Sequence, residues 1–77
     1  MSRYDWSTIK KRFPDVRYVA TDKNGEVWGY YDKPIPDYAW GLWGLPLNSK
    51  RPAEEIETGC CRVLNWMDTL EEWEDKK

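Results

Sequence analysis

The chain is constrained most by an Asn-Gly pair that separates two β-prone segments in the stretch VRYVATDKNGEVWGYYD. Asn24 and Gly25 suit the backbone of a tight turn, and the flanking segments are rich in valine, tyrosine and tryptophan. This pattern predicts a β-hairpin over residues 16–32. Any fold of the chain therefore begins from an antiparallel pair of strands.

The register of this hairpin decides which side chains share a face. A two-residue turn would place Thr21 opposite Trp28, whereas a type I turn over residues 22–25 with a bulge would place Ala20 there. We favour the second register, because aspartate suits the first position of such a turn, which Asp22 would occupy. One face then carries Tyr18, Ala20, Trp28 and Tyr30, and the other carries Val27 and Tyr31.

A short helix is predicted before the hairpin. Asp5 is a good N-cap, and Pro14 ends the helical pattern that follows it. Trp6, Ile9 and Phe13 have the spacing of residues on one face of a helix. The sequence thus predicts a helix over residues 5–13, which is too short to be stable without packing on something larger.

The second half of the chain carries weaker signals. Further strands are expected near residues 38–45 and 59–65. Between them, Pro52 and Gly59 bracket a polar segment that suggests about one helical turn. Asn65 can cap a following segment with apolar residues at helical spacing, which predicts a C-terminal helix. The alternative is that part of this last segment continues as a strand.

A chain of 77 residues forms one domain, so we expect residues 1–77 to fold as a single small unit of the α+β class. An antiparallel sheet of three to four strands would be covered on one face by the short helices. At this size, the free energy of burying apolar surface nearly cancels the lost conformational entropy. The six tryptophans, five tyrosines and one phenylalanine would therefore supply a dense core or a surface for a partner.

The stretch YAWGLWGLP repeats Trp-Gly-Leu, and on a strand its two tryptophans, Trp40 and Trp43, would point to opposite faces. We expect the face with Tyr38, Trp40 and Leu42 to join the core, because it is the more apolar of the two. Trp43, which is followed by Gly44, would then lie nearer a contact surface.

The residue types of common catalytic sites are missing or badly spaced. There is no histidine, which removes the commonest general base, the commonest metal ligand and every Ser-His or Cys-His nucleophile. GEVWG lacks the pattern of a phosphate loop, and DKNGE lacks that of a calcium loop. Cys60 and Cys61 are adjacent, which suits neither a disulfide framework nor a metal clip and indicates two reduced thiols, one of them buried. We expect no enzymatic activity, no metal and no cofactor.

Aromatic side chains are the feature that remains for function. Tryptophan and tyrosine are enriched at interface hot spots, and they also stack on bases and contact cations. The candidate binding residues are Trp28, Tyr30, Tyr31, Trp40 and Trp43. The same side chains could instead fill the core, and the sequence does not separate the two roles residue by residue.

Two segments resemble a known group of proteins. YVATDKNGEVWGYYDKP contains a Val-Ala-x-Asp-x-x-Gly hairpin, an aromatic pair and a proline, and NWMDTLEEW contains Trp-x-Asp-Ser/Thr-Leu. This pattern is similar to that of small tryptophan-rich, mostly uncharacterised proteins encoded by tailed phages and prophages. It covers about half of the chain and departs after Leu70, where such proteins often continue with Arg-Pro. The resemblance implies an accessory protein made inside a bacterium, and it brings no activity or functional residues.

The resulting hypothesis is a non-enzymatic accessory protein that binds and modulates a host protein through an aromatic surface. One alternative is a small-ligand module in which Trp28, Tyr30 and Trp40 stack on a nucleobase, with Arg17 or Lys33 meeting a phosphate. Single-stranded nucleic acid ranks last as a partner, because the net charge is −2 and only the KKR segment offers a positive track. A homo-oligomer is compatible with each hypothesis.

The sequence also bears on location. No stretch approaches the roughly 18 apolar residues of a membrane span, and the N-terminal residues lack the apolar run of a signal peptide. We therefore expect a cytoplasmic protein with no membrane partner, in the bacterial host cytoplasm if a phage encodes it.

Overall fold

The computed structural model describes residues 3–59 and 61–74, within which one short helix, one 3-10 turn and six strands form. Their order is α1 (Trp6–Arg12), β1 (Tyr18–Thr21), β2 (Val27–Tyr30), β3 (Ile35–Asp37), β4 (Leu42–Gly44), β5 (Glu54–Glu57), η1 (Trp66–Asp68) and β6 (Glu71–Glu72). Four strands form an antiparallel sheet in the order β5-β2-β1-β6, and β3 pairs with β4 in a separate sheet. This arrangement agrees with the predicted α+β class and its small antiparallel sheet.

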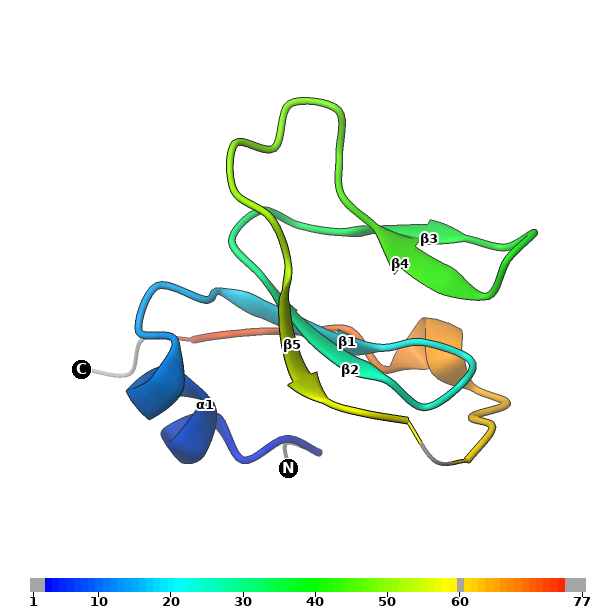
Figure 1. Cartoon of the computed structure of the whole chain (residues 1–77), viewed down its shortest axis with the longest axis horizontal. Helices are drawn as coiled ribbons and strands as arrows, with labels where there is room; N and C mark the ends of the chain where they lie inside the picture. Colours follow the sequence, from blue (N-terminus) through cyan, green and yellow to red (C-terminus); the bar gives the residue numbers. More distant parts are fainter. Residues whose placement is uncertain (1–2, 60, 75–77) are drawn as a thin grey trace.

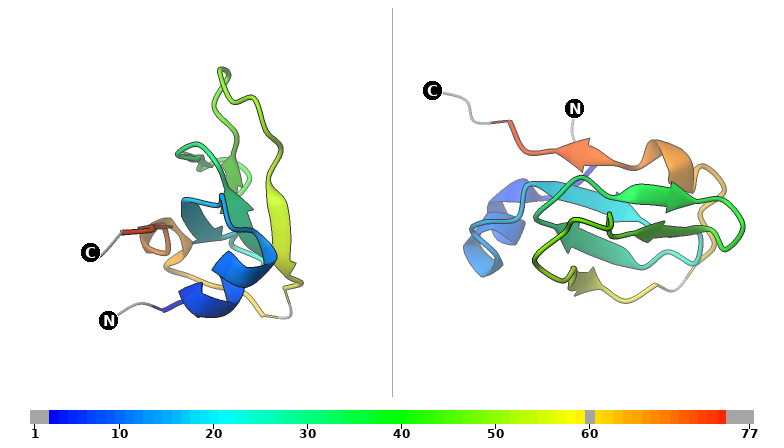
Figure 2. Two further views of the ribbon diagram at one scale, coloured as in Figure 1. Left: turned by 90° about the vertical axis from the view of Figure 1, so that its left-hand side faces the viewer. Right: turned by 90° about the horizontal axis from the view of Figure 1, so that it is seen from above.

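The four-stranded sheet lies between two layers. In Figure 1, α1 lies below one end of this sheet and the β3–β4 hairpin stands above it. Figure 2 shows from above that β3 and β4 lie over β1 and β2, while β5 and β6 form the two edges. We refer to residues 35–44, the β3–β4 hairpin with its turn, as the arm.

The favoured register of the first hairpin is confirmed. Ala20 pairs with Trp28 and Tyr18 pairs with Tyr30. The turn closes with a 2.8 Å hydrogen bond from the Gly25 N–H to the Asp22 carbonyl, and Gly25 has a φ of 92°. A side chain at this φ would be strained, which explains why the fourth residue of the turn is glycine.

The N-terminal helix is also confirmed. The carboxylate of Asp5 accepts a hydrogen bond from the backbone N–H of Thr8 at 3.2 Å, as an N-cap does. Ile9 is the buried residue of α1, and Trp6 and Phe13 pack against the same cluster. The helix is stabilised by this packing on the sheet, because seven residues alone do not hold a helix in water.

Side-chain alternation along β1 and β2 divides the core between the two faces of the sheet. Toward the arm, the buried residues are Ala20, Tyr30, Trp43 and Trp66, with Trp28 packed against them. Toward α1, the buried residues are Ile9, Val16 and Val19, with Val27 and Tyr31 packed against them. The predicted division of the hairpin, Trp28 and Tyr30 against Val27 and Tyr31, is therefore confirmed.

The predicted third strand over 38–45 is wrong in its extent. Residues 38–41 form a turn, because Asp37 accepts hydrogen bonds from the backbone N–H of Ala39 with its side chain and of Gly41 with its carbonyl. Gly41 has a φ of 67°, and a Cβ there would lie 2.8 Å from the Cβ of Lys23. Glycine is thus required both by the turn and by the close approach of the first hairpin.

The expectation for the two tryptophans is reversed. Trp40 lies on the turn with 76% of its surface exposed, whereas Trp43 lies on β4 and is only 8% exposed. Tyr38 and Leu42, expected in the core with Trp40, are exposed as well. The prediction failed because it treated residues 38–43 as one strand, whereas the Gly41 turn takes Trp40 out of the alternation.

Trp43 makes four hydrogen bonds, of which three join the arm to the first hairpin of the main sheet and one reaches η1. Its backbone N–H donates to Asp22 Oδ1 at 2.8 Å, and its carbonyl accepts from the Tyr30 hydroxyl at 3.3 Å. Its indole N–H lies 3.1 Å from the Thr21 carbonyl and 3.3 Å from the Trp66 carbonyl. The ring packs edge-on against Trp66, with 5.8 Å between ring centroids.

The predicted helical turn between Pro52 and Gly59 is wrong, because residues 54–57 form β5 along the outer edge of β2. The segment alternates as an edge strand does. Ile56 packs toward the α1 cluster, while Glu55 and Glu57 are exposed. Pairing with the open edge of β2 outweighs the helical preference of alanine and glutamate.

The predicted strand at 59–65 is also wrong: residues 59 and 61–65 carry no strand, and residue 60 lies outside the described residues. No C-terminal helix is found over residues 65–74. The segment makes the single turn η1 and then pairs as β6 with Tyr18 and Val19, in line with the strand alternative. Trp66 packs on the arm face, whereas Trp73 stacks on Trp6 beside α1. The apolar side of a single C-terminal helix could not contact both faces of the sheet, as these two tryptophans do.

Thr69 completes the edge of β1 beyond the short β6. Its hydroxyl accepts a hydrogen bond from the Thr21 N–H at 2.9 Å, and the Trp66 and Thr21 carbonyls lie 2.7 Å and 3.1 Å from it. Thr69 is fully buried, so these backbone groups have little access to water. A side chain thus replaces the strand partner that β1 lacks at Thr21.

We expect Thr69→Val to lower the free energy of unfolding by about 1–3 kcal/mol, because the buried Thr21 N–H loses its acceptor. Thr69→Ser keeps the hydroxyl and should cost only about 0.8 kcal/mol for the lost methyl group. Urea denaturation followed by tryptophan fluorescence measures both. Equal losses in the two variants would show that the hydroxyl does not stabilise the edge.

Candidate functional site

A groove between the arm and β2 brings together three of the five predicted binding residues. Trp28, Tyr30 and Trp43 line it, with Leu42 and Leu45 also contributing to its walls. Its volume is about 320 Å³, at the lower end of the range for ligand pockets. We call it the arm groove. Tyr30 is 2% exposed, so Tyr30 and Trp43 form part of the core beneath the groove, while Trp28 remains half-buried.

Two carboxylates also line the arm groove. Glu26 accepts a hydrogen bond from the indole N–H of Trp28 at 3.3 Å, which ties the acidic group to the aromatic wall. Asp22 is buried, and burial raises the pKa of its carboxyl above the ordinary 3.8, although the hydrogen bond from Trp43 works in the opposite direction. The groove thus combines an apolar surface with negative charge.

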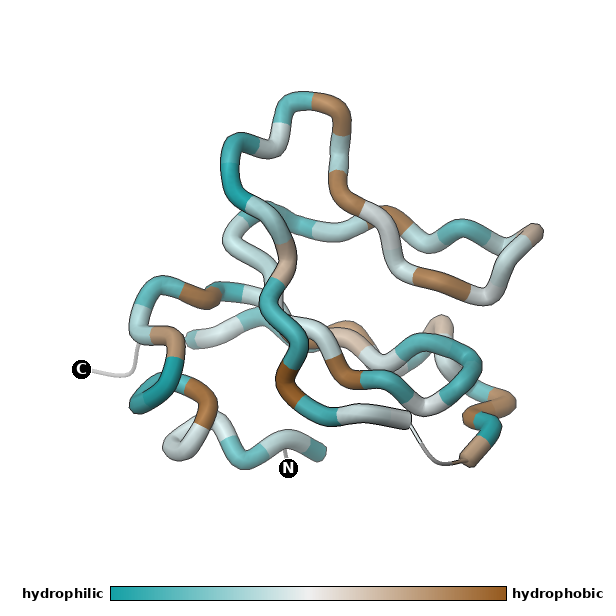
Figure 3. Tube along the Cα trace, in the orientation of Figure 1, coloured by the Kyte–Doolittle hydropathy of each residue, from teal (hydrophilic) through white to brown (hydrophobic). Residues whose placement is uncertain are grey.

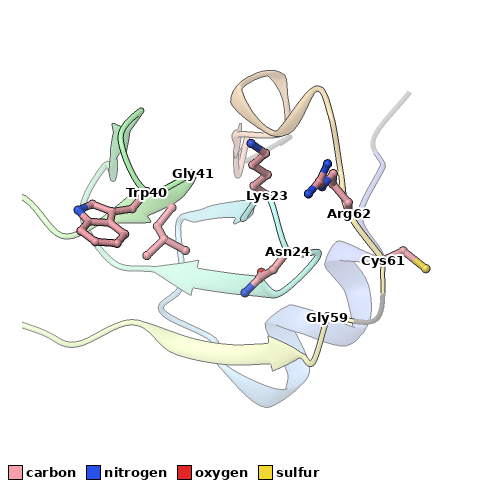
Figure 4. Close-up of a pocket in the computed structure, with 8 residues that line it drawn as sticks. Lys23, Asn24, Trp40, Gly41, Gly59, Cys61 and Arg62 are labelled. Carbon is pink, nitrogen blue, oxygen red and sulfur yellow. The ribbon is translucent and has the colours of Figure 1, made fainter.

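A second hollow opens where three loops meet. It has a volume of about 500 Å³ and is lined by Lys23, Asn24, Trp40 and Arg62, among others. Figure 4 shows Trp40 at one end and Cys61 with Arg62 at the other, with Lys23 and Asn24 between them. We call it the loop hollow. Leu42 lines both this hollow and the arm groove, so the two lie on either side of one side chain.

Tyr31, the fifth predicted binding residue, lies apart from both hollows. The guanidinium of Arg51 lies 3.6 Å from its ring centroid, and its hydroxyl donates to Glu54 at 2.9 Å. Burial, followed by the nearby Glu54, raises the pKa of its phenol. Tyr31 therefore joins the loop before β5 to the main sheet.

The arm and the loop after it are unusually apolar for an exposed segment. Six of the eight large apolar residues that are exposed within 3–59 and 61–74 belong to this part of the chain: Ile35, Tyr38, Trp40, Leu42, Leu45 and Leu47. Figure 3 shows brown, hydrophobic segments along the arm and in the loop that follows it. Exposed apolar residues that cluster in this way mark contact surfaces more often than residues scattered singly.

Sequence reasoning missed several residues of these sites. Leu45 and Glu26 line the arm groove, and Lys23 and Arg62 line the loop hollow. The nucleotide pocket proposed from Trp28, Tyr30 and Trp40 is not assembled, because Tyr30 is buried and the two tryptophans line different hollows. Neither Arg17 nor Lys33 lines either hollow. The sequence gives no signal that Lys23 and Arg62 line the same hollow, since the two are far apart along the chain.

Among the described residues, no group of three histidine, cysteine or acidic side chains is placed to hold a metal ion. Cys61 is exposed and not disulfide-bonded, and Cys60 lies outside the described residues. None of the helices within these residues has the length and apolar character needed to cross a bilayer.

We expect Asp22→Ala to lower the free energy of unfolding by about 1–3 kcal/mol at neutral pH, because the buried Trp43 N–H loses its acceptor. Asp22→Asn keeps an acceptor oxygen and should cost much less. Urea denaturation of both variants makes the comparison. Equal losses would show that the side-chain oxygen does not anchor the arm.

The raised pKa of Asp22 also predicts a pH effect. In the window between its ordinary value of 3.8 and the raised folded value, the folded chain binds more protons than the unfolded chain. Stability therefore falls as pH rises through this window, and the full loss is present at neutral pH. Relative to Asp22→Asn, the wild type should gain stability as pH is lowered from 7 to about 3. A relative loss on acidification in matched urea titrations would contradict this assignment.

No protein-family model matches the chain, and neither a curated protein nor a solved structure matches it significantly.

Proposed function

We propose that this chain is a non-enzymatic accessory protein, encoded by a phage or prophage, that binds and modulates a host protein in the bacterial cytoplasm. Its arm groove is the proposed docking site. The phage origin, and with it the host and the compartment, rests on the resemblance of the hairpin stretch and the NWMDTLEEW stretch to small phage proteins.

The observation that carries the proposal is the exposure of the arm. Large apolar side chains that are exposed on a small protein favour binding, because a partner that covers them removes their surface from water. Trp28, Leu42 and Leu45 line the arm groove, and each is partly exposed. A buried aromatic or aliphatic anchor in a preformed groove is the usual centre of a protein interface.

The chemistry of the groove favours one kind of occupant. Glu26 and Asp22 add negative charge to an apolar surface. The complementary ligand is a segment that inserts one large apolar side chain and carries a lysine or arginine next to it. We therefore propose a host protein with such a basic segment as the partner, rather than a second copy of this acidic chain.

Leu45 and Leu47 provide a matched test, because both are exposed leucines in one loop and Leu45 alone of the two lines the groove. The wild type is first used to capture a binder from bacterial lysate, which is then purified. Its dissociation constant is measured by calorimetry against the wild type, Leu45→Asp and Leu47→Asp. Leu45→Asp should weaken binding at least about 30-fold, as loss of a hot spot does. Leu47→Asp should leave the dissociation constant within about threefold, as expected outside a hot spot.

Two results would overturn the proposal. The first is a captured protein whose affinity is the same for all three chains. The second is a concentration-dependent dimer in light scattering that Leu45→Asp abolishes, because the groove would then be filled by a second copy of the chain.

A second variant tests the role of the negative charge in the arm groove. Glu26→Gln keeps the acceptor oxygen for Trp28 and removes the negative charge, so it should weaken binding and make the affinity less dependent on salt. Calorimetry at 50 and 300 mM NaCl gives both quantities. A salt dependence equal to that of the wild type would show that Glu26 does not meet a basic group.

A further inference from the structure

We infer that the arm groove selects an arginine of the docked partner, whose guanidinium group stacks on Trp28 and donates hydrogen bonds to Asp22 and Glu26. The inference rests on the proposed docking function and names the chemical group that the groove recognises. Specificity would then come from the basic residue of the partner, and the apolar residue beside it would add affinity.

The carboxyl group of Asp22 has one oxygen left for a ligand. Its Oδ1 accepts the Trp43 N–H at 2.8 Å, whereas Oδ2 has no hydrogen-bond partner within residues 3–59 and 61–74. In this part of the chain, every fully enclosed side-chain nitrogen or oxygen has a partner, so Oδ2 is not enclosed. Because Asp22 is only 4% exposed and lines the arm groove, Oδ2 is reached from the groove.

The negative charge of the groove is not offset by the chain itself. Among the described residues, neither Asp22 nor Glu26 forms an ion pair. The two residues are held together at the end of the first hairpin, where the Asp22 N–H donates to the Glu26 carbonyl at 2.8 Å. Burial raises the pKa of the Asp22 carboxyl, and the nearby charge of Glu26 acts in the same direction. A cation supplied by a partner would relieve both effects.

Trp28 adds an aromatic surface to these carboxylates. It lines the groove and is half-buried, and its indole N–H donates to Glu26 at 3.3 Å, which holds the edge of the ring. Tryptophan is the side chain on which cations stack best. No lysine or arginine within residues 3–59 and 61–74 lies over Trp28, whereas three other rings each have a cation of this chain over them: Phe13, Tyr31 and Trp73.

The shape and donor set of the groove favour arginine over other cations. A guanidinium group is planar, so it can stack on an indole ring while its N–H groups donate to carboxylates at its edge. A lysine ammonium has no such plane. A metal ion needs more oxygen ligands, and the described residues contain no group of three acidic side chains placed to hold one. A volume of about 320 Å³ suits inserted side chains rather than a large cofactor.

The experiment titrates the full chain with three acetylated and amidated tetrapeptides. Each has the sequence Ala-Leu-X-Ala, in which X is arginine, lysine or citrulline, the neutral analogue of arginine. Binding is followed by calorimetry and by the indole N–H NMR signal of Trp28, which is assigned by its loss in Trp28→Leu. The arginine peptide should bind at least about tenfold more tightly than the citrulline peptide, because hydrogen bonds between charged groups are the stronger ones. The lysine peptide should bind at least about threefold more weakly than the arginine peptide.

Variants identify the residues through the preference for arginine over citrulline. Asp22→Asn keeps the acceptor for Trp43 and places an amide NH₂ at the Oδ2 position, so the preference should disappear. Glu26→Gln should reduce it at least about threefold, because one of the two charges is lost. Trp28→Leu keeps an apolar wall without an aromatic ring and should weaken the arginine peptide more than the citrulline peptide. Glu57→Gln removes an exposed carboxylate outside the groove and should leave the preference unchanged.

Circular dichroism of each variant shows whether it is folded, and Glu26→Gln with Trp28→Leu tests the inference even where Asp22→Asn does not fold. The inference is overturned if the arginine and citrulline peptides bind the wild type alike, or if lysine binds as tightly as arginine. It is equally overturned if the preference survives in folded Glu26→Gln and Trp28→Leu.

These measurements do not use the captured host protein. Equal binding of the arginine and citrulline peptides would remove the arginine site and leave the docking proposal to its own test with Leu45→Asp. Conversely, equal affinity of the captured protein for the wild type and Leu45→Asp would remove the docking proposal, whereas the peptides would still show whether the groove selects arginine.

Discussion

The structure depends on the attachment of one tryptophan, Trp43, to the end of the first hairpin. The backbone and indole N–H groups of Trp43 donate to Asp22 and to the Thr21 carbonyl, and its carbonyl accepts from Tyr30. Each of these groups is buried or nearly so, so each would be costly to leave without a partner. The arm is a two-stranded sheet that would be marginal on its own, and this attachment gives it a fixed position over the main sheet.

The same attachment accounts for the exposed surface of the protein. With Trp43 turned inward, Leu42 lies on the outer side of β4 and separates the arm groove from the loop hollow. The arm groove is apolar and carries two carboxylates, whereas the loop hollow is lined by an exposed tryptophan and two cations. The two therefore differ in chemistry, although both are built around a single strand of three residues.

The edges of the main sheet explain why the second half of the chain departs from its helical pattern. β1 and β2 each have an outer edge whose N–H and C=O groups need partners. β5 covers one edge, and β6 with the Thr69 hydroxyl covers the other. Helix propensity in short segments is worth only a few tenths of a kcal/mol per residue, which is less than an edge left unpaired would cost.

Local chemistry alone determined the first third of this protein. Asp5 as a cap, the Asp22–Gly25 turn and the alternation around it each act over a few residues, so the helix, the hairpin and its register followed from the sequence. Contacts between distant segments decide which tryptophan is buried and where residues 54–74 pair. They also bring Lys23 and Arg62 to the same hollow. Such contacts compete for the same edges and faces, and only the tertiary structure decides that competition. The sequence therefore predicted that the aromatic residues supply a core or a contact surface. It did not predict that Trp40 is exposed and Trp43 is buried.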